Sequence, residues 1–170
     1  MEEFERYISS YKDFPNKGIV FKDVLEIFQH PLLFKKLIKK MSCVEFLLNA
    51  DAIVSIDARG FLFGSAISFY TSKPLIFARK PGKLPGELIT KSYNLEYGES
   101  SLSLQKKSVE KFSSFAIVDD LLATGGTVNC VYEMLKGLEK NVSGLIVLVE
   151  LKEFEARTKL PFGVSSQVVI

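Results

Sequence analysis

Short runs of apolar residues recur along the chain, and segments with helical periodicity separate them. Nearly continuous apolar runs of four to seven residues are typical of strands that are covered on both faces, as in a parallel sheet. We therefore expect strands at Ala52–Ile56, Leu75–Ala78, Phe115–Val118, Gly144–Glu150 and Ser166–Ile170.

Three helices are predicted between and before these strands. Apolar residues from Leu33 to Leu48 recur with helical spacing after Pro31, a residue that is favourable in the first turn of a helix. The same periodicity predicts helices at Gly60–Tyr70 and from Val128 to Leu138. The alternation of strand and helix indicates an α/β fold with right-handed crossovers.

Composition and charge exclude several classes of protein. The 170 residues suit a single domain, and 22 basic against 20 acidic residues leave no basic excess for binding nucleic acid. Two cysteines and one histidine exclude a disulfide scaffold and a multi-histidine metal centre. No signal peptide is recognisable, and no apolar run approaches the ~20 residues of a membrane span. We expect a soluble protein of the reducing cytoplasm, without a membrane partner.

One interval, residues 80–111, departs from this rhythm. Glycine and proline are frequent in it, and only Leu102 and Leu104 hint at strand alternation. A stretch of this length without firm structure inside a compact domain is usually a functional lid or a disordered insert. We interpret it as a flexible lid because of the residues that it carries.

The strongest chemical signal follows the run Phe115–Val118. Two carboxylates, Asp119 and Asp120, precede a loop of small residues and then a helix. Glycines let backbone N–H groups approach an anion closely, and a helix start leaves unpaired N–H groups. The carboxylates can accept hydrogen bonds from sugar hydroxyls or support hydrated Mg²⁺. A sugar phosphate is therefore predicted here, with its phosphate on Ala123, Thr124, Gly125, Gly126 and Thr127; the alternative is a glycine-rich surface turn.

The run Val118–Thr127 closely resembles the phosphoribosyl pyrophosphate (PRPP) loop of the type I phosphoribosyltransferases, in particular of those that use adenine. Four further stretches agree with that family in the same order: Asp13–Asp23, Asp57–Gly64, Arg79–Gly86 and Tyr93–Gly98. The resemblance implies the type I phosphoribosyltransferase fold, which has a central, mostly parallel sheet flanked by helices. It also implies one domain over residues 1–170, a small N-terminal hood at about 13–23, and a homodimer.

The reaction implied by the resemblance is purine salvage. The phosphoribosyl group of 5-phospho-α-D-ribose 1-diphosphate passes to N9 of adenine, giving AMP and diphosphate, with Mg²⁺ bound mainly through substrate and water. One alternative is a different purine substrate, such as xanthine. Another is a PRPP-sensing regulator without catalysis, but 170 residues with a net charge of +2 leave no room for its DNA-binding module.

The resemblance assigns three catalytic residues. Arg59 would lie near the purine and the pyrophosphate. Glu96 would handle the proton of the purine, because a carboxyl group closing over the base can act as general acid or base. Tyr97 would cover the reaction centre. Closure of the lid over these groups would exclude water from the activated sugar.

The remaining assignments concern binding. The resemblance implies that the pyrophosphate is bound by Asp57, Ala58, Arg79, Lys80 and Lys83, with a cis peptide between Asp57 and Ala58. The purine would stack on Phe21 and meet backbone groups of Val20 and Lys22. Most relatives have arginine where this chain has Lys22. Lysine is compatible with recognition if the backbone makes the contact, and purine affinity suffers if the side chain makes it.

Overall fold

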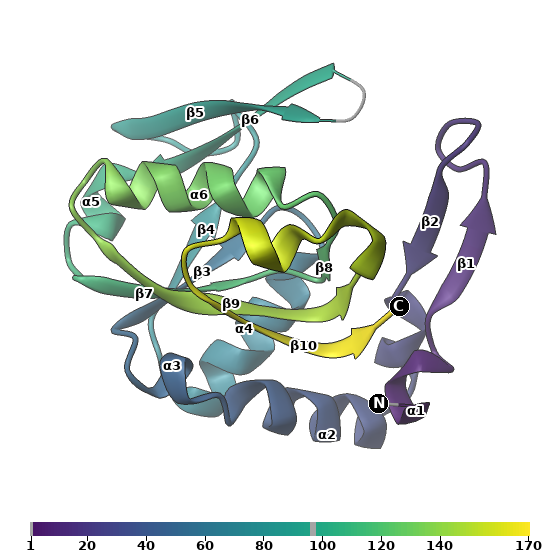
Figure 1. Cartoon of the computed structure of the whole chain (residues 1–170). Coiled ribbons are helices and arrows are strands. Elements are labelled where there is room, and N and C mark those ends of the chain that lie inside the picture. The colour runs from purple at the N-terminus through teal and green to yellow at the C-terminus, as the bar shows by residue number, and fades with distance from the viewer. Residues whose placement is uncertain (1, 96–97) are drawn as a thin grey trace.

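The computed structural model, which describes residues 2–95 and 98–170, is organised around a six-stranded sheet (Figure 1). The strand order is β10-β9-β7-β3-β4, and β8 also pairs with β9. These pairings are parallel. The strands are β3 (Ala52–Ile56), β4 (Leu75–Ala78), β7 (Ser114–Val118), β8 (Leu121–Leu122), β9 (Asn141–Glu150) and β10 (Gly163–Val169).

Helices cover both faces of this sheet, which explains why its central strands β3, β7 and β9 are mainly apolar. On one face lie α2 (Pro31–Ser42), α3 (Glu45–Leu48) and α4 (Gly60–Thr71), and on the other lies α6 (Gly126–Lys136) (Figure 1). Successive residues of β3 alternate between the two layers, so that Ile53 packs with α2 and α4 while Val54 packs with α6. The predicted α/β architecture is confirmed.

The helix expected from Leu33 to Leu48 ends earlier than its periodicity predicts. Helix α2 stops at Ser42, and Val44 has extended backbone angles, φ −89° and ψ 129°, before the short α3 begins. Valine, which is β-branched, favours such an extended conformation. The other two helices begin or end within a few residues of their predicted bounds.

The interval 80–111 contains more regular structure than the sequence predicts. Strands β5 (Leu88–Leu95) and β6 (Gly98–Gln105) form an antiparallel hairpin that lies over α6, followed by α5 (Lys106–Val109) (Figure 1). Leu102 and Leu104 are fully buried in the core layer that contains α6. The expectation of a stretch without firm structure was therefore wrong, whereas the movement of this hairpin as a lid stays a prediction.

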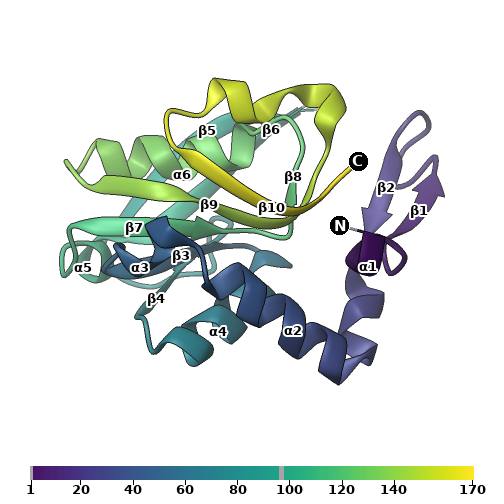
Figure 2. The ribbon, with the colours of Figure 1, turned by 60° about the horizontal axis from the view of Figure 1, so that its bottom comes forward.

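The N-terminal part forms a separate hairpin. Helix α1 (Glu2–Glu5) leads into β1 (Ser9–Lys12), which pairs antiparallel with β2 (Val20–Asp23). Figure 2 shows this hairpin standing to one side of the main sheet. Phe4, Val24 and Ile27 are buried and join its base to the layer of α2 and α4. The 3-10 turn η1 (Leu25–Gln29) connects β2 to α2.

Two further 3-10 turns, η2 (Lys152–Phe154) and η3 (Ala156–Lys159), connect β9 to β10. Among the helices of the described residues, none combines the length and the apolar character needed to cross a lipid bilayer.

Candidate active site

The predicted pyrophosphate and phosphate loops lie side by side. Strands β3 and β7 are neighbours, with Ser55 paired to Val118, so the loops that follow them emerge at the same edge of the sheet. Ligands of α/β sheets bind at this edge, beyond the carboxyl ends of the strands. A pocket of about 400 Å³ opens there, lined by Asp57, Ala58, Arg59, Lys80, Tyr93, Ser100, Asp119, Asp120, Leu121, Leu122, Ala123, Thr124, Gly125, Thr127 and Val128.

Four of the five predicted phosphate-loop residues line this pocket, and Gly126 does not. Gly126 instead lines a smaller pocket of about 250 Å³ on the side of Asn129 and Lys159. Gly125 has a φ of +84°, a conformation that glycine adopts without strain, and the first turn of α6 begins at the next residue. The loop therefore turns sharply and directs the start of α6 towards the pocket region.

The two carboxylates at the end of β7 are nearly buried and differ in their partners. The backbone N–H of Asp120 donates to Asp119 Oδ1 at 2.9 Å, whereas Asp120 Oδ2 lies 2.8 Å from Arg59 Nε. The latter contact is an ion pair without hydrogen-bond alignment. Burial, followed by the charge of Asp120, raises the pKa of Asp119 well above its usual range.

Close packing at Gly60 holds Asp119 against the start of α4. A Cβ atom at Gly60 would lie 2.8 Å from Asp119 Oδ1 and 3.1 Å from the carbonyl oxygen of Val118. Any larger residue would push α4 away from the end of β7. The glycine of the Asp57–Gly64 stretch is therefore required by packing between the two loops.

Arg59 connects the phosphate loop to the N-terminal hairpin. Its Nη1 donates to the carbonyl oxygen of Lys22 at 3.3 Å, and its guanidinium carbon lies 4.9 Å from the centre of the Phe21 ring. Together with the ion pair to Asp120, these contacts join three separate segments. Arg59, predicted to lie near the purine and the pyrophosphate, thus lies where the phosphate loop meets the N-terminal hairpin.

A second pocket, of about 530 Å³, lies on the hairpin side of Arg59. It is lined by Gly18, Ile19, Val20, Phe21, Lys22, Arg59, Leu121, Ala123, Leu151, Glu153 and Phe154. Arg59, Leu121 and Ala123 line both pockets, so the two cavities adjoin. All three predicted purine-binding residues are in this second pocket.

The side chain of Lys22 is directed along its own hairpin. Its Nζ donates to Ser10 Oγ of β1 at 3.0 Å, while its carbonyl oxygen accepts from Arg59. The polar group of Lys22 that faces Arg59 is thus its backbone carbonyl. Of the two alternatives for purine contact, the backbone or the side chain of Lys22, this geometry favours the backbone.

The predicted pyrophosphate residues divide into two groups. Asp57 accepts from Arg79 Nε at 3.3 Å and from the backbone N–H of Lys80 at 3.5 Å. The peptide between Asp57 and Ala58 is cis, as the resemblance implies. Lys80 lines the 400 Å³ pocket, whereas Arg79 and Lys83 are not among its described lining residues. Arg79 Nη1 instead donates to the Lys83 carbonyl at 3.4 Å.

Glu96 and Tyr97 lie outside the described residues. Their hairpin nevertheless borders the site, because Tyr93 of β5 and Ser100 of β6 line the 400 Å³ pocket.

Sequence reasoning missed one wall of the 530 Å³ pocket. Leu151, Glu153 and Phe154 follow directly after β9 and face the hairpin across the cavity. No local motif marks them. The position of their strand could have revealed them, because β9 lies next to β7 and its carboxyl end reaches the same sheet edge.

Comparison with known proteins agrees with this geometry. The family described as "Phosphoribosyl transferase domain" matches residues 23–161. An adenine phosphoribosyltransferase of Prochlorococcus marinus subsp. pastoris is 64% identical over 166 residues, which cover 98% of this chain and 97% of the relative. One of Mycoplasmopsis synoviae is 40% identical over 163 residues, covering 94% of this chain and 95% of that relative.

Solved structures lead to the same family. The adenine phosphoribosyltransferase of Thermoanaerobacter pseudethanolicus superposes with a TM-score of 0.91 at 36% identity, covering 99% of both chains. The enzyme of Saccharomyces cerevisiae, crystallised with an imino-altritol bisphosphate and adenine, gives 0.84 at 33% identity, covering 98% of this chain and 97% of the other. The matched domain, the sequence relatives and the solved structures agree, and the chain therefore belongs to the adenine phosphoribosyltransferase family.

Proposed function

We propose that the protein transfers the phosphoribosyl group of PRPP to N9 of adenine, giving AMP and diphosphate in purine salvage. The observation that carries this proposal is that the 400 Å³ and 530 Å³ pockets adjoin, because Arg59, Leu121 and Ala123 line both. One pocket has carboxylates and a helix start suited to a sugar phosphate. The other has an aromatic ring and backbone groups suited to a planar base.

In the proposed complex, the 5′-phosphate binds the loop from Ala123 to Thr127, where N–H groups and the start of α6 favour an anion. The ribose hydroxyls donate to Asp119 and Asp120. This arrangement is supported by the burial of both carboxylates at the pocket, because buried acceptors need donors from a ligand or the protein.

The pyrophosphate is assigned to Asp57, Ala58 and Lys80, with Arg79 and Lys83 nearby. Cations and backbone donors around the leaving group stabilise the negative charge that develops as the C1–O bond loosens. The contact of Asp57 with both Arg79 and the backbone of Lys80 supports this assignment, because it orients two residues of the basic segment together.

The base is assigned to the 530 Å³ pocket. Phe21 would stack on the ring, and backbone groups of Val20 and Lys22 would meet the amidine edge of adenine. Attack through N9 requires loss of a proton or stabilisation at N7, and Glu96 is the proposed acid–base group. Tyr97 is proposed to cover the reaction centre, and the β5–β6 hairpin to move as the lid.

In the proposed complex, Mg²⁺ binds mainly through the substrate and water. Across the described residues, no three His, Cys, Asp or Glu side chains form a metal cage. The two pocket carboxylates are oxygen ligands of the kind Mg²⁺ takes directly or through water, while PRPP would supply further oxygens. When bound, Mg²⁺ would neutralise charge on the departing diphosphate.

A homodimer is also part of the proposal. Helix α4 is apolar on its exposed side as well as its buried side, with Leu62, Phe69 and Tyr70 accessible, and Phe77 of the edge strand β4 is accessible too. A surface helix that is apolar on every side favours burial against a partner. The cytoplasmic location expected from the sequence remains a prediction.

The test is a coupled assay for nucleotide formation from PRPP with adenine, hypoxanthine, guanine and xanthine, each with and without Mg²⁺. We expect turnover with adenine that depends on Mg²⁺. Negligible turnover of adenine beside turnover of xanthine or another purine would overturn the choice of substrate. Absence of turnover with every purine would overturn the enzymatic function.

A further inference from the structure

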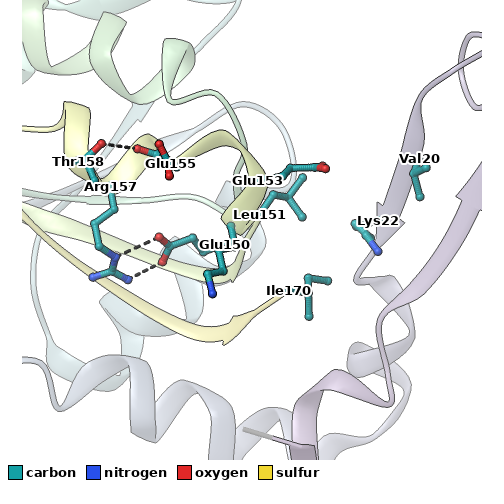
Figure 3. Close-up of a pocket in the computed structure, with 10 residues that line it drawn as sticks. Val20, Lys22, Glu150, Leu151, Glu153, Glu155, Arg157, Thr158 and Ile170 are labelled. Carbon is teal, nitrogen blue, oxygen red and sulfur yellow. Dashed lines mark hydrogen bonds and ion pairs between the residues drawn. The ribbon is translucent and has the colours of Figure 1, made fainter.

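A third cavity, of about 700 Å³, lies at the carboxyl ends of β9 and β10 (Figure 3). It adjoins the purine pocket, because Val20, Lys22, Leu151 and Glu153 line both. Glu150 is at this cavity, and the residue is only 7% exposed. A nearly buried carboxylate requires partners, and those of Glu150 are Arg157 of the segment that connects the two strands and Ser166 of β10.

Arg157 holds Glu150 through a two-point contact. Its Nε donates to Glu150 Oε1 at 3.0 Å, and its Nη2 donates to Oε2 of the same carboxylate (Figure 3). Hydrogen bonds from Arg157 keep the pKa of Glu150 below its usual range, so the pair is charged at neutral pH. A bidentate pair fixes orientation as well as distance.

The same guanidinium group also holds β10. Arg157 Nη1 donates to the carbonyl oxygen of Val164 at 2.6 Å, and Ser166 Oγ donates to Glu150 Oε2 at 2.7 Å. All three nitrogens of Arg157 are therefore engaged by β9 or β10. The segment that carries Arg157 is tied to the sheet by one side chain.

This segment, Lys152–Lys159, touches both halves of the proposed site. At one end, Glu153 and Phe154 line the purine pocket. At the other, Ala156 is buried behind the phosphate loop, and a Cβ atom at Gly125 would lie only 3.4 Å from its methyl group. Arg157 is the next residue along the chain, so a shift at Arg157 displaces Ala156 and the purine wall together.

We propose that Glu150 and Arg157 form a positioning pair that holds the purine wall and the back of the phosphate loop in place at once. This inference rests on the proposed adenine transfer. Neither side chain is among the described residues that line the 400 Å³ or 530 Å³ pockets. They therefore act through Phe154 on one side and Ala156 on the other.

The test compares Arg157→Ala, Arg157→Lys and Glu150→Gln with the wild type. We expect the KM values for adenine and for PRPP both to rise on the order of 10-fold, with kcat much less changed, because misplaced walls weaken binding. Lysine cannot make the bidentate contact, so Arg157→Lys should resemble Arg157→Ala. The double variant Glu150→Gln with Arg157→Ala should be no worse than the more affected of these two single variants.

Two controls separate positioning from stability. Lys152→Gln alters the same segment at an exposed residue that lines neither the 400 Å³ nor the 530 Å³ pocket, and Met41→Ala destabilises the fold from the core of α2. Both should keep wild-type KM values, although Met41→Ala lowers Tm. Calorimetry with AMP, which carries both the purine and the 5′-phosphate, should show weaker binding only for the Glu150 and Arg157 variants.

Wild-type KM values and AMP affinity in the Glu150 and Arg157 variants would overturn the proposal, as would equal changes in Met41→Ala at a similar Tm. A rise in KM for adenine alone would overturn the link to the phosphate loop. If Arg157→Ala does not fold, Glu150→Gln, which keeps the shape of the side chain, decides the question. A wild-type protein inactive with adenine would instead refute the proposed function.

Discussion

Arg59 forms an ion pair with Asp120, with its Nε 2.8 Å from Asp120 Oδ2. The two residues come from neighbouring loops of the sheet, although 60 residues lie between them in the sequence. The same guanidinium group covers the Phe21 ring of the N-terminal hairpin at 4.9 Å. One side chain thus links the carboxylates of the 400 Å³ pocket to the aromatic ring of the 530 Å³ pocket.

Replacement of Arg59 should therefore affect both substrates. We expect Arg59→Ala to lower kcat/KM for adenine and PRPP by about 10²-fold, because it removes a preorganised cation between the two pockets. Arg59→Lys retains the charge near Asp120 but loses the planar group over Phe21, so adenine should be affected more than PRPP. Steady-state kinetics with Lys107→Ala, an exposed residue of α5, as control measures this; equal kinetics in Arg59→Ala and the control would contradict it.

Asp119→Asn should stabilise the free protein at neutral pH. Burial raises the pKa of Asp119, so the folded state keeps a proton that the unfolded chain releases. The free energy of unfolding therefore falls as the pH rises from the pKa of Asp119 in the unfolded chain towards its higher pKa in the folded state. Asparagine removes this cost and keeps an acceptor for the Asp120 N–H. The gain in Tm should shrink as the pH falls below about 4, the ordinary pKa of aspartate.

Asp51 is a matched control, because its pKa is shifted in the opposite direction from that of Asp119. Backbone hydrogen bonds from Ser113 and Ser114 lower the pKa of Asp51, so its contribution to stability is present at neutral pH and is lost as pH falls. Asp51→Asn should thus lower Tm at neutral pH. Thermal unfolding between pH 3 and 8 measures both variants; a lower Tm for Asp119→Asn at pH 7 would contradict our expectation. Calorimetry should also show weaker PRPP binding in Asp119→Asn alone.

Glu96→Gln should lower kcat by about 10²-fold while the KM for adenine changes little, if this carboxyl group moves the proton of the purine. The pH–rate profile should also lose the limb that this group contributes. Glu87→Gln, at the base of the same hairpin and paired with Lys106 at 2.8 Å, is the control. A wild-type rate for Glu96→Gln would remove this residue from the chemistry.

Gly125→Ala should weaken PRPP binding and destabilise the protein. A side chain at φ +84° costs about 1–2 kcal/mol, and the new methyl group would press on Ala156. Gly86→Ala has the same backbone cost at φ +85° but meets nothing within 4 Å. Calorimetric titration with PRPP should separate the two, and equal affinities would count against the phosphate loop.

Phe69→Glu should convert the proposed dimer to a monomer, because it places a charge in the apolar surface of α4. Phe69 is 90% exposed, and Leu32 of α2, which is 86% exposed, allows the matched control Leu32→Glu. Light scattering after size-exclusion chromatography measures the mass. A dimer that persists in Phe69→Glu would refute this interface. A wild-type protein that is a monomer would refute the dimer itself.

The parts that sequence reasoning predicted share a physical property. Strands β3 and β4 begin and end where their predicted runs do, and β3 is buried on both faces, which favours a mainly apolar sequence. The phosphate loop was recognisable because glycine, threonine and aspartate stand together between a strand and a helix. In these segments the local residues themselves specify the structure.

The parts that were missed depend on contacts between distant segments. Strand β1 reads Ser9–Lys12 and is mostly exposed, so it has no apolar pattern, and only its pairing with β2 makes it a strand. The wall of the 530 Å³ pocket formed by Leu151, Glu153 and Phe154 likewise has no motif of its own. It becomes part of the site because β9 ends beside β7 and because Arg157 ties the segment down.

The independence of the N-terminal hairpin has a consequence for how such proteins diversify. Strands β1 and β2 pair with each other in a sheet of their own, apart from the strands that carry the phosphate loop. Under the proposed assignment of the base to the 530 Å³ pocket, substitutions at the hairpin residues that line it would alter base preference without changing the strands that carry the phosphate loop.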